Sequence, residues 1–132
     1  QGGGGRPALT AFYPGRPAID AYGAGGFRFA GMSHRGSILA LPSGVYSWAV
    51  DPEALKLEDF AAALAERDDI DLLIFGSGTS LSRPPRAVRE ATEATGMNID
   101  CMATGHAVST YNLLLEEKRK IAAALVAVDR PR

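Results

Sequence analysis

The stretch IDLLIFGSGTS, residues 70–80, decides the fold, because an apolar run passes there directly into a glycine-rich turn. Residues 70–75 are apolar on both faces except at Asp71, which is typical of a strand buried on both sides of a sheet. We therefore expect a central strand that ends in the turn. A glycine-rich turn after a buried strand raises the question of whether a phosphate group binds there.

Helical and strand patterns alternate around this central strand. Some apolar residues recur with helical periodicity, whereas shorter runs alternate or are apolar throughout, as strands do. The patterns predict helices over residues 51–69, 83–96 and 104–115, and strands over residues 97–102 and 121–128. This order predicts an α/β fold with a mixed, mostly parallel sheet that is flanked by helices.

The N-terminal part differs in texture from the rest of the chain. Glycines punctuate the short apolar runs of residues 19–48, which predicts a β-rich meander of antiparallel strands joined by tight turns. Residues 1–17 are rich in glycine and proline, so we expect them to form a flexible N-terminal arm. Residues 18–132 are then expected to form a single domain, since this length suits one hydrophobic core.

Composition argues against several classes of function. The 132 residues carry a formal net charge of -1 and no block of Lys and Arg, so a nucleic-acid partner is not expected. The longest apolar runs, such as residues 122–128, are far shorter than the roughly 20 residues that cross a bilayer, so membrane insertion is not expected either. Cys101 is the single cysteine, and with only His34 and His106 beside it we expect neither a disulfide nor a metal site. We expect a reducing, cytoplasmic location, without a secretory or mitochondrial targeting segment.

The glycine-rich turn lacks the residues that nucleotide binding requires. A dinucleotide fingerprint needs a third glycine where Leu81 stands, and a Walker loop needs a lysine, which does not occur between Lys56 and Lys118. We therefore expect no nucleotide cofactor, and no other cofactor is indicated. Two interpretations remain open, a plain turn or a small anion-binding nest of backbone N–H groups. The candidate ligand-binding residues of the turn are Gly76, Ser77, Gly78 and Thr79.

A second candidate region, residues 104–106, follows the strand predicted at 97–102. If that strand is parallel to the central strand, both strands end at the same edge of the sheet, where crevices form. Thr104, Gly105 and His106 would then present a helix N-terminus, which favours anions through its dipole and unpaired donors. The alternative interpretation is that Thr104 only caps the helix and that His106 is solvated.

The sequence does not predict a catalytic centre. Cys101 lies in the apolar phase of a strand, where a thiol is usually inert, so we do not expect it to act as a nucleophile with His106. Ser77 lies outside a nucleophile-elbow motif. Residues 33–36, SHRG, are expected to form a solvated hairpin turn. Asn112 is a poor helix former in the middle of a predicted helix, and we expect its side chain to bond a neighbouring loop.

The succession of motifs resembles that of a known family. The segments that carry the resemblance are IDAYGAGGFRFAG at 19–31, LLIFGSGTS at 72–80 with the following Pro84 and Pro85, GMNIDCMATGHAVSTYNLL at 96–114 and EEKRKIAAAL at 116–125. They resemble the Mth-like family of unknown function, whose eukaryotic relatives include a mitochondrial assembly factor of respiratory complex I. The resemblance implies a three-layer α/β fold with a mixed sheet, helices on its faces and a β-rich N-terminal portion. It implies no catalytic residues.

Two main hypotheses for function follow. The first, which the resemblance favours, is a non-enzymatic protein-interaction or assembly-factor-like domain with a protein partner. The alternative is small-molecule or anion binding, with or without catalysis, in a crevice between loops 76–80 and 104–106. A homo-oligomer is a third possibility. The candidate partner surface consists of the aromatic residues Tyr22, Phe27, Tyr46 and Trp48.

Overall fold

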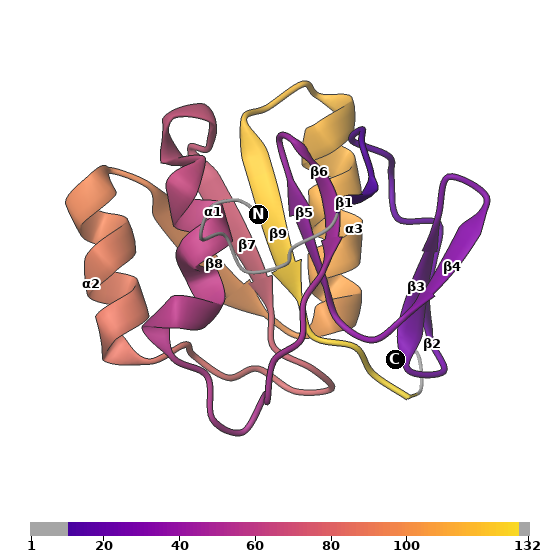
Figure 1. The fold of residues 1–132 in the computed structure, drawn as a ribbon, viewed down its shortest axis with the longest axis horizontal. Helices are drawn as coiled ribbons and strands as arrows, with labels where there is room; N and C mark the ends of the chain where they lie inside the picture. Colours follow the sequence, from indigo (N-terminus) through magenta and orange to yellow (C-terminus); the bar gives the residue numbers. More distant parts are fainter. Residues whose placement is uncertain (1–10, 130–132) are drawn as a thin grey trace, which may run out of the picture.

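The computed structural model describes residues 11–129, which form two β-sheets and three α-helices (Figure 1). The strands are β1 (Ala11–Tyr13), β2 (Ala21–Gly23), β3 (Gly26–Phe29), β4 (Met32–Arg35), β5 (Ile38–Leu41), β6 (Gly44–Ser47), β7 (Leu72–Gly76), β8 (Asn98–Met102) and β9 (Ile121–Leu125). The helices are α1 (Ala61–Ala65), α2 (Arg86–Thr95) and α3 (Thr104–Glu116), with 3-10 turns η1 (Leu57–Phe60) and η2 (Arg67–Asp69) on either side of α1.

The large sheet is mixed, with the strand order β1-β6-β5-β9-β7-β8. The predicted central strand is confirmed as β7, which pairs in parallel with β8 on one side and with β9 on the other. The mixed α/β fold is also confirmed, but the sheet is not mostly parallel, because β1, β6, β5 and β9 pair in antiparallel fashion. The physical reason is the short connection between β5 and β6, which permits only an antiparallel hairpin.

Helices cover both faces of this sheet (Figure 1). Successive side chains of β7 point to opposite faces, so Ile74 belongs to one core cluster and Leu73 and Phe75 to the other. The first cluster includes α3 through Tyr111, and the second includes α2 through Val88. Sheet and helices thus form the three layers that the resemblance implies.

The β-rich N-terminal portion is divided between two sheets, which the sequence did not indicate. β2, β3 and β4 form a separate antiparallel sheet, while β5 and β6 join the large sheet. Two-residue turns with positive φ at both positions, Ala24-Gly25 and Ala30-Gly31, connect the three strands of the small sheet. The segment 33–36 was expected to be a turn, but His34 and Arg35 lie in β4.

The large sheet begins earlier in the chain than expected. β1 pairs with β6 and Arg16 donates a hydrogen bond to the Ile121 carbonyl, so residues 11–16 differ from the predicted flexible arm over 1–17. The rest of that predicted arm, residues 1–10, lies outside the described residues, as do residues 130–132. Sequence periodicity missed β1 because the strand has only three residues, which is too few to show alternation.

The predicted helix over residues 51–69 is shorter and irregular. It begins as the 3-10 turn η1 and continues as the five-residue α1. Phe60 and Ala63 are buried, whereas Leu57, which was expected on the same apolar stripe, is exposed. A 3-10 turn has three residues per turn rather than 3.6, so it displaces the stripe that an α-helix would give.

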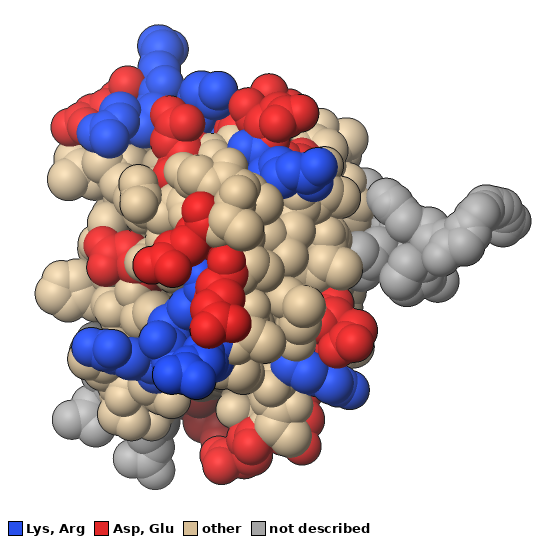
Figure 2. Space-filling model, turned by 90° about the vertical axis from the view of Figure 1, so that its left-hand side faces the viewer, with Lys and Arg blue, Asp and Glu red and all other residues tan. Residues whose placement is uncertain are grey.

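Charges of both signs are interspersed on the face of the molecule that carries α1 and α2. Figure 2 shows acidic and basic side chains side by side there, without a tract of one sign. Arg86 and Glu90, one turn apart on α2, approach to 3.7 Å in an exposed ion pair. This face therefore lacks the continuous basic track that would bind a phosphate backbone.

Candidate functional site

The ends of the three parallel strands β7, β8 and β9 are joined by Thr104. Its hydroxyl accepts a hydrogen bond from the Gly78 N–H at 2.9 Å and donates one to the Val126 carbonyl at 2.7 Å. Its own N–H donates to the Gly78 carbonyl at 2.8 Å. The two predicted loops therefore do lie at one edge of the sheet, but the buried Thr104 uses its polar groups to hold them together.

Thr104 is not the helix cap that the sequence suggested. The residue before it, Ala103, is the N-cap of α3, and Thr104 is the first residue of the helix. Its hydroxyl satisfies one donor and one acceptor from two other chain segments. Because an unpaired buried polar group costs free energy, this bridge stabilises the strand ends and leaves the hydroxyl unavailable to a ligand.

The two glycines of the turn are explained by packing and backbone geometry. A Cβ atom at Gly76 would lie 2.9 Å from Leu125 Cδ2, 3.1 Å from Ala107 Cβ and 3.1 Å from Thr104 Cα. Glycine at this position therefore lets α3 pack closely against β7 and β9. Gly78 has a φ of 111°, a conformation that side chains rarely adopt. The sequence pattern of a phosphate loop thus arises here from helix packing and a turn.

The rest of the turn is held together by Ser77. Its hydroxyl donates to the Ser80 carbonyl at 2.7 Å and accepts from the Ser82 N–H at 2.9 Å. A hydroxyl that is engaged in this way closes the loop on itself. This geometry agrees with the expectation that Ser77 is not a nucleophile.

A cavity of about 150 Å³ remains between the loops, beyond the Thr104 bridge. Four of the predicted ligand-binding residues contribute to its lining, whereas Gly76, Ser77 and Thr104 do not. The aromatic residue Tyr22 also borders it, from the small sheet. The lining residues are Tyr22, Gly78, Thr79, Ala103, Gly105, His106 and Val128.

The predicted aromatic partner surface is largely internal. Phe27 and Trp48 are only 2% and 4% exposed, so the prediction that they lie on the partner surface is wrong. Both pack into the cores, where Trp48 makes an edge-on contact with Phe60 at 5.4 Å between ring centroids. Tyr46 is half-buried with its hydroxyl 2.6 Å from Ser43 Oγ, and Tyr22 is half-buried. Aromatic residues in short strands are more often core than surface, and the strand register decides which.

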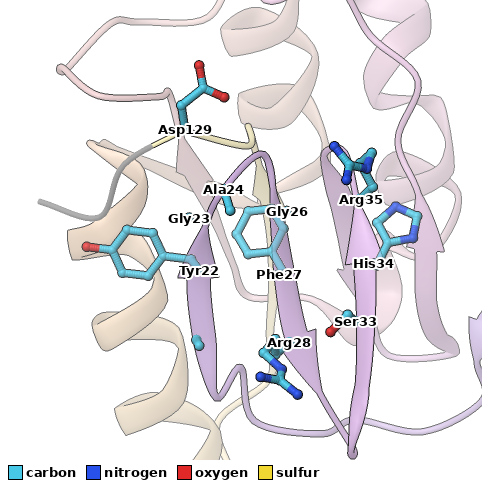
Figure 3. A pocket seen from close by; sticks show the side chains of 11 residues that line it. Tyr22, Gly23, Ala24, Gly26, Phe27, Arg28, Ser33, His34, Arg35 and Asp129 are labelled. Atoms are coloured by element: carbon cyan, nitrogen blue, oxygen red, sulfur yellow. The ribbon is translucent and has the colours of Figure 1, made fainter.

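A larger concavity than the loop cavity lies on the small sheet. It has a volume of about 570 Å³ and is shown in Figure 3. We call it the sheet hollow; its lining residues are Ala21, Tyr22, Gly23, Ala24, Gly26, Phe27, Arg28, Ser33, His34, Arg35 and Asp129.

Strand register explains why this face is open. Phe27 and Phe29 point into the core, so Arg28 between them points to the opposite face of β3. Arg28 pairs across the sheet with Ser33 and Ala21, and Gly26 pairs with Arg35 and Gly23. Small residues therefore form the floor on β2 and β3, and two arginines rise from it (Figure 3).

Both arginines of the sheet hollow have free guanidinium groups. Within residues 11–129, neither Arg28 nor Arg35 forms an ion pair or a side-chain hydrogen bond with another residue. Arg35 falls in the segment 33–36 that was expected to form a solvated turn, so the sequence did not predict that it shares a face with Arg28. One signal in the sequence could have shown that the two arginines share a face. Residues 32–35, MSHR, alternate in polarity, and they can pair with the alternating residues 26–29, GFRF.

Cys101 has the properties of a structural cysteine. Burial raises the pKa of its thiol above the ordinary value, and the neighbouring Asp100 carboxylate raises it further. Arg83 and Arg89 lower the pKa, but their effect is smaller. A raised pKa leaves less thiolate, which is the nucleophilic form. No cluster of three or more His, Cys, Asp or Glu side chains suited to a metal ion occurs within the described residues.

The six-stranded mixed sheet with helices on both faces, together with the small antiparallel sheet, defines a small mixed α/β domain. The chain belongs to the family described as "Protein of unknown function (DUF498/DUF598)", whose model matches residues 19–126. An uncharacterized protein of Rhodobacter capsulatus is 35% identical to it over 114 residues, which are 86% of this chain and 87% of that protein. The human NADH dehydrogenase [ubiquinone] 1 alpha subcomplex assembly factor 3 is 30% identical over 122 residues. That match covers 92% of this chain and 64% of the human protein.

Solved structures confirm the Mth-like fold. A crystal structure described as an outer membrane protein from Bartonella henselae superposes with a TM-score of 0.85 at 47% identity, over 88% of this chain and 98% of that one. The Mth938-like domain of a Bordetella pertussis protein superposes with a TM-score of 0.73 at 24% identity, over 87% of each chain. At that identity the second likeness concerns the fold alone. Among the described residues, none of the helices has the length and apolar character needed to cross a membrane.

Proposed function

We propose that this chain is a non-enzymatic protein-interaction domain of the assembly-factor kind, which binds a protein partner through the sheet hollow. The observation that carries the proposal is the hollow on the small sheet, which has a volume of about 570 Å³ and two arginines that form no ion pair or side-chain hydrogen bond within residues 11–129. Arginine is enriched at protein interfaces because its planar group forms several hydrogen bonds and its stem packs on apolar surface. The kinship with complex I assembly factors supports a protein partner rather than a substrate.

The floor of the hollow suits a polypeptide more than a small compound. Ala21 and Gly23 have little or no side chain, so another main chain can approach β2 closely. At the strand ends of the large sheet, by contrast, the Thr104 bridge holds the loops together, and the cavity between them has a volume of about 150 Å³.

Photo-crosslinking from the hollow tests this proposal. A benzoylphenylalanine is placed at Ser33, which is exposed in the hollow, and, as a matched control, at Ser109, which is exposed on α3. In native cells we expect one discrete adduct with another protein from position 33 and none from position 109. Replacing Ala21 by Trp, which fills the hollow, should abolish the adduct, whereas the Ala94→Trp change on exposed α2 should leave it unchanged.

Equal labelling from both positions, or an adduct that survives Ala21→Trp, would contradict the proposal. An adduct between two copies of the chain would instead support the homo-oligomer that the sequence left open. A cytoplasmic location stays a prediction from the single cysteine.

A second candidate function is binding of a small anion in the 150 Å³ cavity between the loops. The observation in its favour is that Gly105 and His106, in the first turn of α3, line that cavity together with Thr79. Thermal unfolding in the presence of phosphate, nucleotides or small carboxylates tests it. A ligand at a hundred times its Kd adds about 2.7 kcal/mol of stability, which would be lost in a His106→Gln, Thr79→Ala variant. Unfolding temperatures that no anion changes would exclude this function.

A further inference from the structure

We propose that the sheet hollow recognises an extended acidic segment of the partner, with carboxylates at two positions that are two residues apart. This inference rests on the proposed function and specifies the chemistry of the partner. Arg28 and Arg35 are the residues that would bind the two carboxylates, and among the described residues that line the hollow no other side chain carries a fixed positive charge.

The positions of the two arginines set the spacing. Arg28 lies directly opposite Ser33, and Arg35 is two residues further along β4 on the same face. Such diagonal neighbours in an antiparallel sheet are roughly 7–8 Å apart. Side chains at positions i and i+2 of an extended chain are about 7 Å apart and share one face. The spacing of Asp or Glu at alternate positions of an extended segment therefore matches the spacing of the two arginine positions on the sheet.

The unpaired state of the arginines favours carboxylates as their partners. A guanidinium group forms two parallel hydrogen bonds with a carboxylate, and such charge-assisted bonds are shorter and stronger than neutral ones. Neither arginine has an acidic partner within residues 11–129, so a ligand would not have to displace an existing ion pair.

Asp129 places a negative charge at one end of the hollow. Its main-chain carbonyl accepts a hydrogen bond from the Ala24 N–H at 2.7 Å, which fixes this residue beside the turn between β2 and β3. Its carboxylate lies at that end of the hollow, away from Arg28 (Figure 3). A further acidic side chain of the partner would be repelled there, whereas a basic or amide side chain would be accepted. The acidic residues are thus confined to the β3–β4 side.

NMR titration of the full chain with a short peptide tests the inference. The probe is acetyl-Gly-Glu-Gly-Glu-Gly-amide, and the control peptide carries Gln in place of both Glu residues. We expect the acidic peptide to shift the amide signals of residues 21–28 and 33–35, and the Gln peptide to bind at least about tenfold more weakly. The R28Q/R35Q variant should lose the same effect, whereas R86Q, which removes an exposed arginine of α2, should retain it.

The outcomes separate this inference from the proposed function. Equal binding of both peptides, or shifts confined to α2, would overturn the acidic specificity. If the crosslink from Ser33 forms in those circumstances, the hollow binds a partner of different chemistry and only this inference fails. If the crosslink is also absent, the proposed function fails as well.

Discussion

Two regions of this molecule carry residues that can bind anions, and they differ in how far the chain itself uses those residues. At the ends of β7, β8 and β9, the donors of Gly78 and Thr104 are used within the chain. On the small sheet, the guanidinium groups of Arg28 and Arg35 have no partner in the described part of the chain. The glycine-rich loop therefore contributes to stability, whereas strands β3 and β4 carry the exposed side chains that can bind an anion.

The difference follows from what each region must satisfy. Strand ends that are covered by a helix have buried polar groups, and each of these groups needs a hydrogen-bond partner. The outer face of a small antiparallel sheet has no such requirement, because its side chains point to solvent. Substitutions should therefore affect stability in the first region and binding in the second.

Thr104→Val should give the largest loss of stability. The change keeps the shape of the side chain but removes its hydroxyl, which leaves the Gly78 N–H and the Val126 carbonyl without this partner. Each unsatisfied buried group costs about 1–3 kcal/mol, so we expect a loss of about 2–4 kcal/mol in the free energy of unfolding in urea. Thr104→Ser retains the hydroxyl and should lose no more than about 1 kcal/mol. Equal losses in both variants would show that the bridge contributes little.

Gly76→Ala should be the next most damaging change. The added methyl group would meet Leu125, Ala107 and the main chain of Thr104 at 2.9–3.1 Å, so α3 would have to move away from the sheet. Overpacking of this kind costs about 1–3 kcal/mol. The control is Gly15→Ala, whose methyl group would meet only the movable ring of Tyr13, and which should be neutral or slightly stabilising. A neutral Gly76→Ala variant would refute the packing explanation for this glycine.

Asn112→Ala should have a moderate effect. The Asn112 side chain accepts from the Ile19 N–H and donates to the Ile19 carbonyl, both at 2.8 Å, so it ties α3 to the segment before β2. Two lost hydrogen bonds, offset by the better helix propensity of alanine, leave a net loss of about 1 kcal/mol in unfolding free energy. Ser109→Ala on the exposed side of the same helix should not destabilise the protein. A gain in stability from Asn112→Ala would contradict this role.

The R28Q/R35Q double variant should have the smallest effect on stability. Both arginine side chains are exposed and form no ion pair or side-chain hydrogen bond within residues 11–129, so the free energy of unfolding should change by less than about 0.5 kcal/mol. Chemical denaturation of the variant beside the unchanged chain measures this directly. A loss above about 1 kcal/mol would mean that the arginines serve the fold, as Thr104 does.

Local patterns predicted much of the fold, because burial on both faces leaves a clear mark on a sequence. The apolar run of β7, the parallel neighbour β8 and the bonding of Asn112 to another segment were all predicted correctly. What the sequence lacked was the assignment of strands to sheets. The short strands β4, MSHR, and β5, ILAL, follow each other closely in the chain, and it is the pairing of β5 with β9 that places β5 in the large sheet.

The candidate sites were harder to predict for the same reason. Phe27 and Trp48 are buried and Arg28 is exposed, although all three lie in or beside short strands. The register of the small sheet decides which of its side chains face the core, and a one-residue shift would exchange them. The 76–80 and 104–106 loops were brought together correctly, but a hydrogen-bond network such as that of Thr104 depends on distances that spacing along the chain does not give.

One titration compares the two regions most directly. The dissociation constant of the acidic peptide acetyl-Gly-Glu-Gly-Glu-Gly-amide would be measured for the R28Q/R35Q variant and for His106→Gln, which alters the loop cavity. We predict weakening of at least about tenfold in the first variant and no change in the second. Weaker binding by His106→Gln together with unchanged binding by R28Q/R35Q would place the anion site at the strand ends. That result would contradict the assignment of the anion-binding site to the small sheet.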